Sequence, residues 1–442
     1  MGKYKILHIT PHLGGGVGSV LTKYLKYAKN NKNYKHTLFS LEDINTSSKK
    51  VLIDNNIPYK ENLSAKYKKI LKEIHNFDIV IIHWWNHPLL YKLITKYSLP
   101  KCRVAIWSHI SGLFAPSNFT KPLFDYADEF VFTTPISYGS SIVKKLPKHN
   151  LNKTNIICST VGVEHLKNVK KEQHKSFNVG YLGTVDYSKL HKDFLEMSNN
   201  VDIEDINFIV CGGNNEKQIE QESIKKGVSK KFTFTGKIVN IEEYLSKFDI
   251  FGYPLSPYHF GTCDQALKEA MTCGIVPVVF NNPMEKSIIQ HFQTGIIVNN
   301  KNEYSSSIKL LYEDYQLREK LSKNAKIFAQ NNFSLDTMIE KWEKLFDEML
   351  RIKPSKKKWN SKYQGKLITP LQIFLESTGK NKKYFNNLLI NKTKKNSTIK
   401  KRIFNEIWES PTKGTLNHYC NIFKDKELNK LKEKFNNIIK GK

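Results

Sequence analysis

The chain has 442 residues, which is enough for roughly two to four ordinary domains. Hydrophobic residues make up 40% and charged residues 25%, a balance that supports packed cores and excludes wholesale disorder. The 6 cysteines are scattered without a Cys-x-x-Cys pair, which disfavours a disulfide scaffold and a zinc module and favours a reducing cytosol.

The formal net charge is +29, and much of it lies near the C-terminus. Residues 353–442 hold 23 lysines and arginines against 6 acids, which is more than half of the excess. Such a balance favours an anionic partner, such as phospholipid headgroups or an acidic glycan. The cations are mixed with the aromatic residues Trp359, Tyr384, Phe385 and Trp408, a mixture that suits an anionic membrane surface. Nucleic acid is a weaker candidate because no recognition module is visible.

No segment predicts a membrane helix or a secretory leader. The longest apolar run, around Ile79 to Trp85, is much shorter than the roughly 18 to 20 residues that a bilayer requires. The N-terminal residues lead directly into a strand-like Ile6-Leu7-His8-Ile9, without a long apolar region or a cleavage site. We therefore expect a cytoplasmic protein, either free or peripheral on the inner face of the cell membrane through its basic C-terminus.

The first block, about residues 1–165, alternates short apolar runs with amphipathic stretches. Strands are expected at 5–10, 36–41, 77–83, 103–107, 130–133 and 155–158. A glycine-rich loop, Gly14 to Gly18, follows the first strand and precedes a helix expected at about Ser19 to Lys29. Strands that alternate with helices predict parallel βαβ units and a doubly wound α/β sheet.

The pattern restarts after a lysine-rich linker at about 166–175. Further strands are expected at 178–183, 207–213, 232–236, 250–254 and 276–280, and most of them leave through Gly or Pro. Open α/β sheets bind ligands at the carboxyl ends of their strands, so this edge is the expected binding site. Two such domains in tandem predict a cleft between them.

A helical tract follows at about 304–351, with a break near residues 331–334. Ser334 or Asp336 could cap the last helix, which is expected at Met338 to Leu350. Beyond it, short helical pieces alternate with spacers rich in lysine and asparagine.

The most informative segment reads as loop, helix and strand between Tyr258 and Val279. Thr262 and Gln265 have the spacing of a capping box, and Gly274 is the expected helix stop. The free N–H groups at such a helix start suit a phosphate, and Glu269 could accept hydrogen bonds from a ribose diol. An ordinary capped helix with a surface glutamate is the alternative.

These motifs resemble the family-4 retaining glycosyltransferases, also called glycosyl transferases group 1. The matching segments are Phe260-Gly261, 269–274, 277–279, the first strand with its glycine loop, 179–184 and 232–236. The resemblance covers about residues 4–350 and implies the GT-B fold, an α/β architecture of two Rossmann-like domains facing across a cleft. It places an acceptor domain at 1–168, a donor domain at 169–335 and a closing helix at 336–352 that packs back toward the N-terminal domain. The basic helical extension, 353–442, has no counterpart.

The resemblance also implies the site residues. His109 and Glu269 are the expected catalytic residues. The expected donor-binding residues are Gly16, Val17, Gly183, Thr184, Lys189, Gly212, Gly236, Lys237, His259, Phe260, Gly261, Thr262 and Glu269. An acceptor platform is expected after the third strand, where aromatic side chains could stack on a sugar, at His83, Trp84, Trp85 and Asn86.

Two departures from the family pattern affect this site. The family carries two glutamates eight positions apart; Glu269 fits the second, whereas Gly261 stands eight positions earlier, with Asp264 and His259 as candidate substitutes. Thr184 stands where many relatives have an arginine for the diphosphate, and Lys189 can supply a cation instead.

The expected function is transfer of a sugar from a UDP- or GDP-sugar to a glycan or lipid-linked acceptor, with retention, in cell-surface polysaccharide synthesis. No metal or other cofactor is expected, because no His or Cys spacing suggests a metal site. A catalytically inactive GT-B adaptor and a nucleotide-sugar 2-epimerase remain alternatives. A dehydrogenase is disfavoured because Gly14-x-Gly16 is followed by Ser19 and not by the third glycine of the fingerprint.

Overall fold

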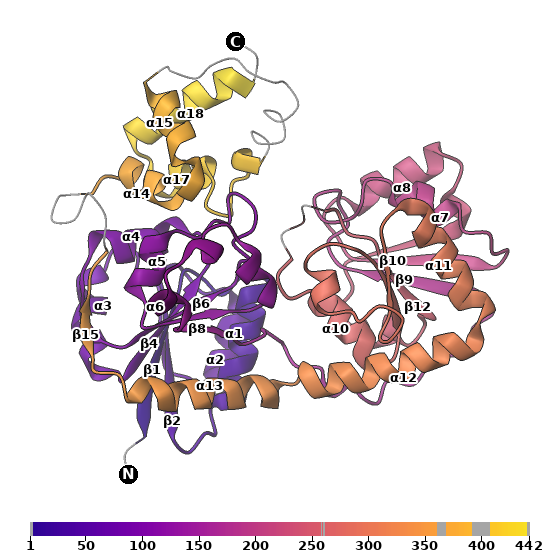
Figure 1. The fold of residues 1–442 in the computed structure, drawn as a ribbon, viewed down its shortest axis with the longest axis horizontal. Helices are drawn as coiled ribbons and strands as arrows, with labels where there is room; N and C mark the ends of the chain where they lie inside the picture. The colour runs from indigo at the N-terminus through magenta and orange to yellow at the C-terminus, as the bar shows by residue number, and fades with distance from the viewer. Residues whose placement is uncertain (1–2, 258, 260, 360–367, 391–406, 440–442) are drawn as a thin grey trace. The chain divides into compact units, whose positions relative to one another are not determined.

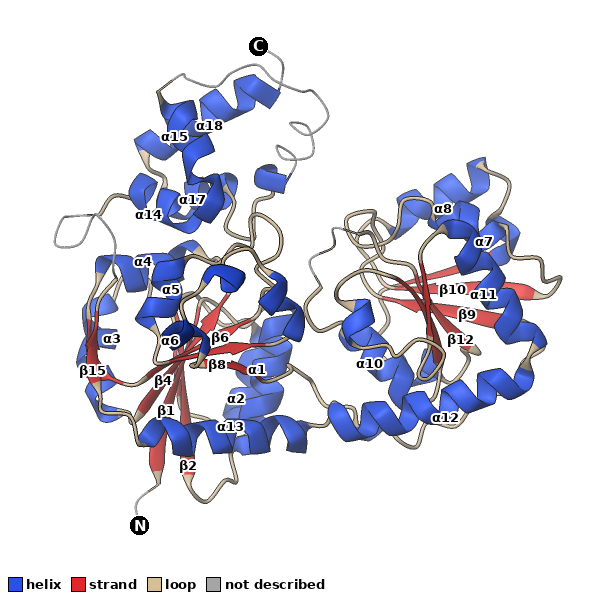
Figure 2. Ribbon diagram, viewed as in Figure 1, coloured by secondary structure: helices blue, strands red, loops and turns tan. Residues whose placement is uncertain are grey.

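The computed structural model describes residues 3–257, 259, 261–359, 368–390 and 407–439. The chain forms two compact units: residues 1–159 together with 339–442 are unit 1, and residues 160–338 are unit 2. In each unit a parallel sheet is covered by helices (Figures 1 and 2). Both α/β sheets that the sequence predicts are therefore present.

The sheet of unit 1 has seven strands in the order β3-β2-β1-β4-β6-β7-β8, all parallel. Their bounds are β1 (Tyr4–Thr10), β2 (Tyr34–Ser40), β3 (Tyr59–Lys60), β4 (Ile79–Trp84), β6 (Val104–Ser108), β7 (Glu129–Phe132) and β8 (Thr154–Ile156). The central strand β4 is buried along its whole length, as a strand with helices on both faces must be. This strand order is that of a Rossmann-type doubly wound sheet.

The first helix of unit 1 differs from the sequence expectation. Helix α1 (Gly15–Ala28) begins inside the predicted glycine loop and not at Ser19. A Cβ on Gly18 would lie 2.1 Å from the carbonyl oxygen of Leu13, so only glycine lets the helix pass this close to the end of β1. The other helices before the chain enters unit 2 are α2 (Thr46–Asp54), α3 (Tyr67–Glu73), α4 (Pro88–Lys96), α5 (Lys121–Tyr126) and α6 (Lys148–Leu151).

The sheet of unit 2 has six parallel strands in the order β11-β10-β9-β12-β13-β14, again the Rossmann order. Their bounds are β9 (Phe177–Leu182), β10 (Ile206–Cys211), β11 (Phe232–Gly236), β12 (Ile250–Tyr253), β13 (Val276–Phe280) and β14 (Ile296–Val298). The helices are α7 (Phe194–Asn199), α8 (Glu216–Lys225), α9 (Ile241–Leu245), α10 (Gln265–Thr272), α11 (Lys301–Glu313) and α12 (Tyr315–Asn332). The edge strand β14 was not predicted, because its three residues are too few to show the hydrophobic pattern that marks a strand.

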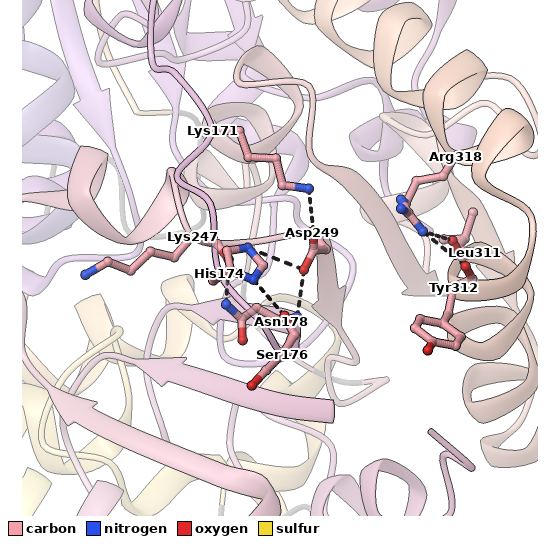
Figure 3. Close-up of polar contacts among 9 residues, drawn as sticks. All are labelled: Lys171, His174, Ser176, Asn178, Lys247, Asp249, Leu311, Tyr312 and Arg318. Carbon is pink, nitrogen blue, oxygen red and sulfur yellow. Dashed lines mark hydrogen bonds and ion pairs between the residues drawn. The ribbon is translucent and has the colours of Figure 1, made fainter. Parts of the chain in front are cut away.

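Asp249 fixes the beginning of this sheet (Figure 3). Its carboxylate accepts a hydrogen bond from the backbone N–H of Asn178 at 2.8 Å and pairs with Lys171. His174 Nε2 lies 3.6 Å from the same carboxylate. The lysine-rich segment that the sequence marks as a linker is thus held against β9 and β12. At the other side of Figure 3, Arg318 donates to the carbonyl oxygens that end α11.

Helix α13 (Leu335–Leu350) begins at the predicted break. Ser334 Oγ accepts a hydrogen bond from the N–H of Thr337 at 3.1 Å, which confirms Ser334 as a cap. From Ile339 onward the helix belongs to unit 1, where Trp342 packs edge-on against Trp107 with ring centroids 4.9 Å apart.

The C-terminal block is an integral part of unit 1. Strand β15 (Ser355–Lys357) pairs antiparallel with β5 (Leu99–Cys102), and the helices α14 (Pro370–Ser377), α15 (Lys382–Leu389), α17 (Leu416–Phe423) and α18 (Lys426–Ile439) follow. Their apolar side chains join the same core cluster as those of α4 and α5. Trp359, Phe385 and Trp408, which the sequence suggests for a membrane surface, are buried in this core. That part of the interpretation is wrong, since core side chains cannot contact lipid. Among the described residues, no helix is both long and apolar enough to span a bilayer.

Candidate functional site

Glycines bring the carboxyl ends of three neighbouring strands of unit 2 close together. A Cβ on Gly212, after β10, would lie 1.7 Å from the carbonyl oxygen of Gly183, after β9. A Cβ on Gly213 would meet the side chain of Lys237, which follows β11. A Cβ on Gly183 would lie 3.2 Å from Lys189 Nζ. The structure therefore gathers predicted donor residues at one edge, with two lysines beside the partly exposed backbone of these glycines.

The start of α10 differs from the helix start predicted from the sequence. The helix begins at Gln265, and its N-cap is Asp264, in a left-handed conformation with φ of 28°. Thr262 lies before this cap, so the proposed capping box with Gln265 is wrong. The amides of Leu267 and Lys268 point back to the Asp264 carbonyl oxygen. The predicted helix stop is confirmed, since Gly274 follows with φ of 77°.

Gly261 is enclosed by two polar side chains of this loop. A Cβ there would lie 2.6 Å from Asp264 Oδ1 and 2.8 Å from His259 Nδ1. Lys189 Nζ lies 4.0 Å from the same Asp264 oxygen, while Asp264 Oδ2 is buried without a hydrogen-bond partner among the described residues. The two substitutes considered for the missing glutamate, His259 and Asp264, are thus neighbours of the predicted cation.

His259 is paired with an acid that the sequence did not indicate. Its Nε2 lies 2.8 Å from Glu285 Oε1, and the Glu285 side chain has no exposed surface. Its Nδ1 accepts the N–H of Gly261 at 3.0 Å, so Nε2 carries the proton. Burial acts to lower the pKa of His259, but the hydrogen bond and charge of Glu285 outweigh it and the pKa is raised. Glu285 was missed because it follows β13, just beyond the end of the recognised motif, and no local spacing links it to His259.

Glu269 lies in the second turn of α10 and is 8% exposed. Burial raises its pKa to about 7, opposed by the Gln265 amide and the Lys268 ammonium. A carboxyl poised near neutral pH can hold or release a proton as a ligand arrives. The sequence placed Glu269 correctly on this helix, and its contact with a diol stays a prediction.

In unit 1, the predicted acceptor platform is mostly buried. Trp84 is fully buried and packs against Tyr91 with centroids 4.7 Å apart, so it is a core residue and cannot stack on a sugar. Asn86 is also buried, and its amide donates to the carbonyl oxygen of Pro116. Trp85 is the partly exposed member, beside His109. The predicted Gly16 and Val17 lie in the first turn of α1, because the helix starts earlier than expected.

His83 and His109 belong to a row of four histidines, hereafter the histidine row. His36 Nδ1 lies 2.9 Å from His8 Nε2, His8 Nδ1 lies 3.0 Å from His83 Nε2, and His83 Nδ1 lies 3.1 Å from His109 Nε2. The four rings are 0 to 9% exposed. The row crosses β2, β1 and β4 and ends at His109, directly after β6. His83 is therefore too deeply buried to contact an acceptor.

A second histidine cluster lies at the carboxyl ends of β1, β2 and β4, and one of its members comes from the C-terminal block. The ring of His418, from α17, is 4.7 Å from that of His87, whose Nε2 is 3.8 Å from Glu42. His12 stacks edge-on with His87 at 5.8 Å. The Nδ1 atoms of the three histidines accept backbone N–H groups, so each neutral ring carries its proton on Nε2.

The position of the ring proton on Nε2 affects whether these histidines can bind a metal. Within the part of the chain that the structure describes, two groups of side chains lie close enough to hold an ion: His12–Glu42–His87 and His259–Asp264–Glu285. A metal at Nε2 would need the proton on Nδ1, where a backbone N–H already points in each histidine. Both sets are thus better suited to donate hydrogen bonds than to ligate a cation.

The structure thus collects Gly183, Lys189, Gly212, Lys237 and the loop before α10 at one edge. Thr184 is exposed beside them, and Gly236, with φ of 67°, ends β11. Phe260 lies outside the described residues.

Comparison with known proteins agrees with this geometry. Residues 163–328 match the family model described as Glycosyl transferases group 1, so unit 2 carries a domain of that kind. The 2-deoxystreptamine N-acetyl-D-glucosaminyltransferase of Niallia circulans is 25% identical over 236 residues, covering 43% of this chain. The match spans 60% of that relative's length.

Two solved structures show the same fold. The glycosyltransferase of Rickettsia africae superposes with a TM-score of 0.65 at 15% identity, covering 79% of this chain and 100% of that one. Anabaena HepE in complex with UDP-glucose superposes with a TM-score of 0.60 at 15% identity, covering 78% and 99%. The predicted fold class, two Rossmann-like domains as in GT-B glycosyltransferases, is confirmed, with a helical C-terminal region in addition.

Proposed function

We propose that this protein is a family-4 glycosyltransferase that moves a sugar from a nucleoside-diphosphate sugar to a glycan or lipid-linked acceptor, with retention of the anomeric configuration. The group 1 domain and the UDP-glucose in the similar Anabaena structure support a nucleotide-sugar donor. Cell-surface polysaccharide synthesis is the proposed setting. The observation that carries the proposal is the meeting of Lys189, Gly183 and the Asp264 loop at the carboxyl edge of unit 2.

The chemistry of the reaction fits this edge. As the bond between the anomeric carbon and the diphosphate oxygen breaks, negative charge grows on the leaving diphosphate. Lys189 and the backbone beside Gly183 and Gly212 are preorganised to stabilise that charge. The N-terminus of α10 adds a partial positive charge. Glu269 is proposed to accept the hydroxyl hydrogens of the nucleoside.

The sugar is proposed to lie beside His259. Its Nε2–H is held by Glu285, and Asp264 supplies an acceptor on the other side of Gly261. This arrangement supplies acids near the position of the missing glutamate, which weakens the case for an inactive adaptor. The acceptor hydroxyl is proposed to attack from the face that the diphosphate leaves, so no enzyme nucleophile is required.

The experiment is a screen of UDP- and GDP-sugars for thermal stabilisation of the full chain, followed by assay of nucleotide release. We expect one donor to stabilise the protein and Lys189→Ala to lower kcat/KM by about 10- to 100-fold, as loss of a charged contact to a diphosphate does. The exposed neighbour Lys192→Ala is the matched control and should keep wild-type turnover.

Three results would contradict parts of this proposal. Binding without turnover for every acceptor tested would indicate the adaptor. Conversion of the donor to its 2-epimer without an acceptor would indicate the epimerase. A product with inverted anomeric configuration, read by NMR, would remove the retaining mechanism.

A further inference from the structure

Lysines gather at the amino ends of the first strands of unit 1. Lys3 precedes β1, Lys5 lies in β1 and Lys35 lies in β2, while Lys29 directly follows α1, the helix that leads into β2. Because the strands of this sheet are all parallel, this edge is opposite the carboxyl edge that bears His109. A ligand bound at the amino edge is therefore separate from the sugar-transfer site proposed above.

The lysines line a cavity of about 430 Å³, hereafter the lysine cavity. Its volume is in the range of pockets that hold small organic ligands. Four lysines line it, and among the described residues no aspartate or glutamate does. Much of the remaining wall is made of apolar and amide side chains: Leu25, Ile57, Pro58, Phe77, Asn56 and Asn76.

We propose that the lysine cavity binds a soluble phosphate monoester, a small organic molecule that carries one phosphate. The ammonium groups hold the phosphate, and the apolar wall beside Phe77 holds the organic part. Four cations suit a phosphate monoester, with its charge of about −1.5 to −2 and three free oxygens, better than a carboxylate with one charge and two oxygens. This inference does not depend on the proposed function.

Two of the lysines are direct neighbours on adjacent strands. Lys5 is paired in register with Lys35, so both side chains leave the same face of the sheet about 4.8 Å apart. Like charges at such positions destabilise a sheet. Among the described residues neither ammonium pairs with an acid, since the Asp78 carboxylate accepts the backbone N–H of Lys5 at 2.8 Å. A bound dianion replaces this repulsion with attraction to both charges.

The other two lysines are held by neutral partners. Lys3 Nζ donates to the carbonyl oxygen of Asn31 at 2.9 Å, and Lys29 Nζ donates to Asn55 Oδ1 at 2.9 Å. An ammonium has three N–H donors, so each lysine keeps donors for a ligand. These contacts hold two long side chains in place and leave their charges uncompensated.

Negative charge near the cavity is engaged elsewhere. Glu343 accepts the side-chain amide of Asn31, and Asp347 accepts the O–H of Tyr34 at 2.5 Å. The C-terminal ends of α1 and α2 add about half a negative charge each, which is small beside four ammonium groups. The cavity therefore keeps a positive excess that attracts anions.

A buried polar group also faces the lysine cavity. His36 lines the cavity and is 8% exposed. Its Nδ1 lies 2.9 Å from His8 Nε2, whereas among the described residues its own Nε2 has no hydrogen-bond partner. With Nδ1 accepting from His8, Nε2 carries a proton that a phosphate oxygen can accept. The ring is neutral at pH 7, since burial lowers its pKa to about 4, so it contributes a directed donor without adding charge.

A ³¹P NMR titration of the full chain with glucose 1-phosphate tests the site. We expect saturable binding that the double variant Lys5→Gln/Lys35→Gln weakens at least tenfold, because it removes both paired charges. The matched control is Lys23→Gln/Lys26→Gln, which removes two exposed lysines of α1 outside the cavity and should keep wild-type affinity. Absence of saturable binding, or equal losses in the two double variants, overturns the proposal.

Two further variants locate the phosphate. His36→Phe keeps an aromatic ring beside Tyr24 and Phe346 but lacks the donor, and it should weaken binding about fivefold, as loss of one neutral hydrogen bond does. Lys189→Ala, at the proposed donor site of unit 2, should leave this affinity unchanged. Wild-type affinity in a folded His36→Phe, or loss of binding in Lys189→Ala, would place the phosphate elsewhere and overturn the proposal.

A vesicle experiment separates a soluble ligand from a lipid headgroup. Phosphatidic acid also carries a phosphate monoester, so the full chain is co-sedimented with phosphatidylcholine vesicles that contain it. We expect 10 mM glucose 1-phosphate to saturate the cavity in solution without any vesicle. Binding to the vesicles that Lys5→Gln/Lys35→Gln abolishes, with no binding of glucose 1-phosphate, would overturn the assignment of a soluble ligand.

Discussion

Replacing one member of the histidine row should change how the stability of unit 1 depends on pH. His36 is buried, and its pKa in the folded protein is lowered from 6.5 to about 4 because burial disfavours the charged ring. In the unfolded chain the ring titrates near 6.5. A lowered folded pKa gives stability that is fully present above pH 6.5 and is lost as the pH falls toward 4.

The magnitude follows from these two values. At pH 5 the unfolded ring binds a proton that the folded ring does not, which costs about 2 kcal/mol. His109, whose folded pKa is about 3 for the same reason, costs a similar amount, and the other members of the row act in the same direction. Glu129 opposes them, since burial raises its pKa to about 7 and favours the folded state in acid. A comparison of wild type with His36→Gln cancels this opposing contribution.

Tryptophan fluorescence is a selective probe for this test, because all 6 tryptophans lie in unit 1. Urea unfolding is measured at pH 7.5 and pH 5 for wild type, His36→Gln and the exposed control His75→Gln. Wild type should lose about 2 kcal/mol more on acidification than His36→Gln, whereas the control should follow wild type. Parallel profiles for wild type and His36→Gln would refute a neutral, buried His36.

Three further predictions follow from the packing and the charges. Phe374→Ala should lower the free energy of unfolding of unit 1 by about 3 to 5 kcal/mol, because this C-terminal side chain is fully buried in the common core. The same fluorescence measures the loss, and a loss below about 1 kcal/mol would mean that the C-terminal block is dispensable for stability. Gly261→Ala should weaken donor binding at least tenfold in calorimetry, since its Cβ would displace Asp264. Gly139→Ala, where a Cβ has room, is the control, and equal donor affinities of the two variants would contradict the loop geometry. Donor affinity should fall about tenfold between pH 8 and pH 6 as Glu269, with a pKa of about 7, takes up a proton, and Glu269→Gln should abolish that dependence relative to wild type.

Periodicity and glycine placement predicted much of unit 2. Apolar runs that end in Gly183, Gly212 and Gly236 predicted strands whose carboxyl ends meet, and the structure brings those ends together. The start of α10 was placed too early because Thr262 and Gln265 satisfy a local spacing rule. Asp264 adopts a left-handed conformation that the spacing cannot reveal, and it begins the helix instead.

The predictions for the acceptor platform and for the aromatic residues of the C-terminal block were wrong for a different reason. Aromatic residues such as Trp84 and Trp359 suit a sugar or a lipid surface as well as a core, and composition does not distinguish these surroundings. Burial decided the question, because the C-terminal helices share one core with α4 and α5. The charge excess predicted an anionic partner, whereas the apolar residues between the lysines were available to pack inward.

The sequence by itself determined the two parallel sheets, the glycine-edged strands and the helix that bears Glu269, because each depends on residues close together along the chain. Tertiary structure alone decided that Glu285 holds His259 and that four histidines from four chain segments form a single hydrogen-bonded row. Such pairings depend on strand register and strand order, and no local pattern records which distant residues those will bring within hydrogen-bonding distance.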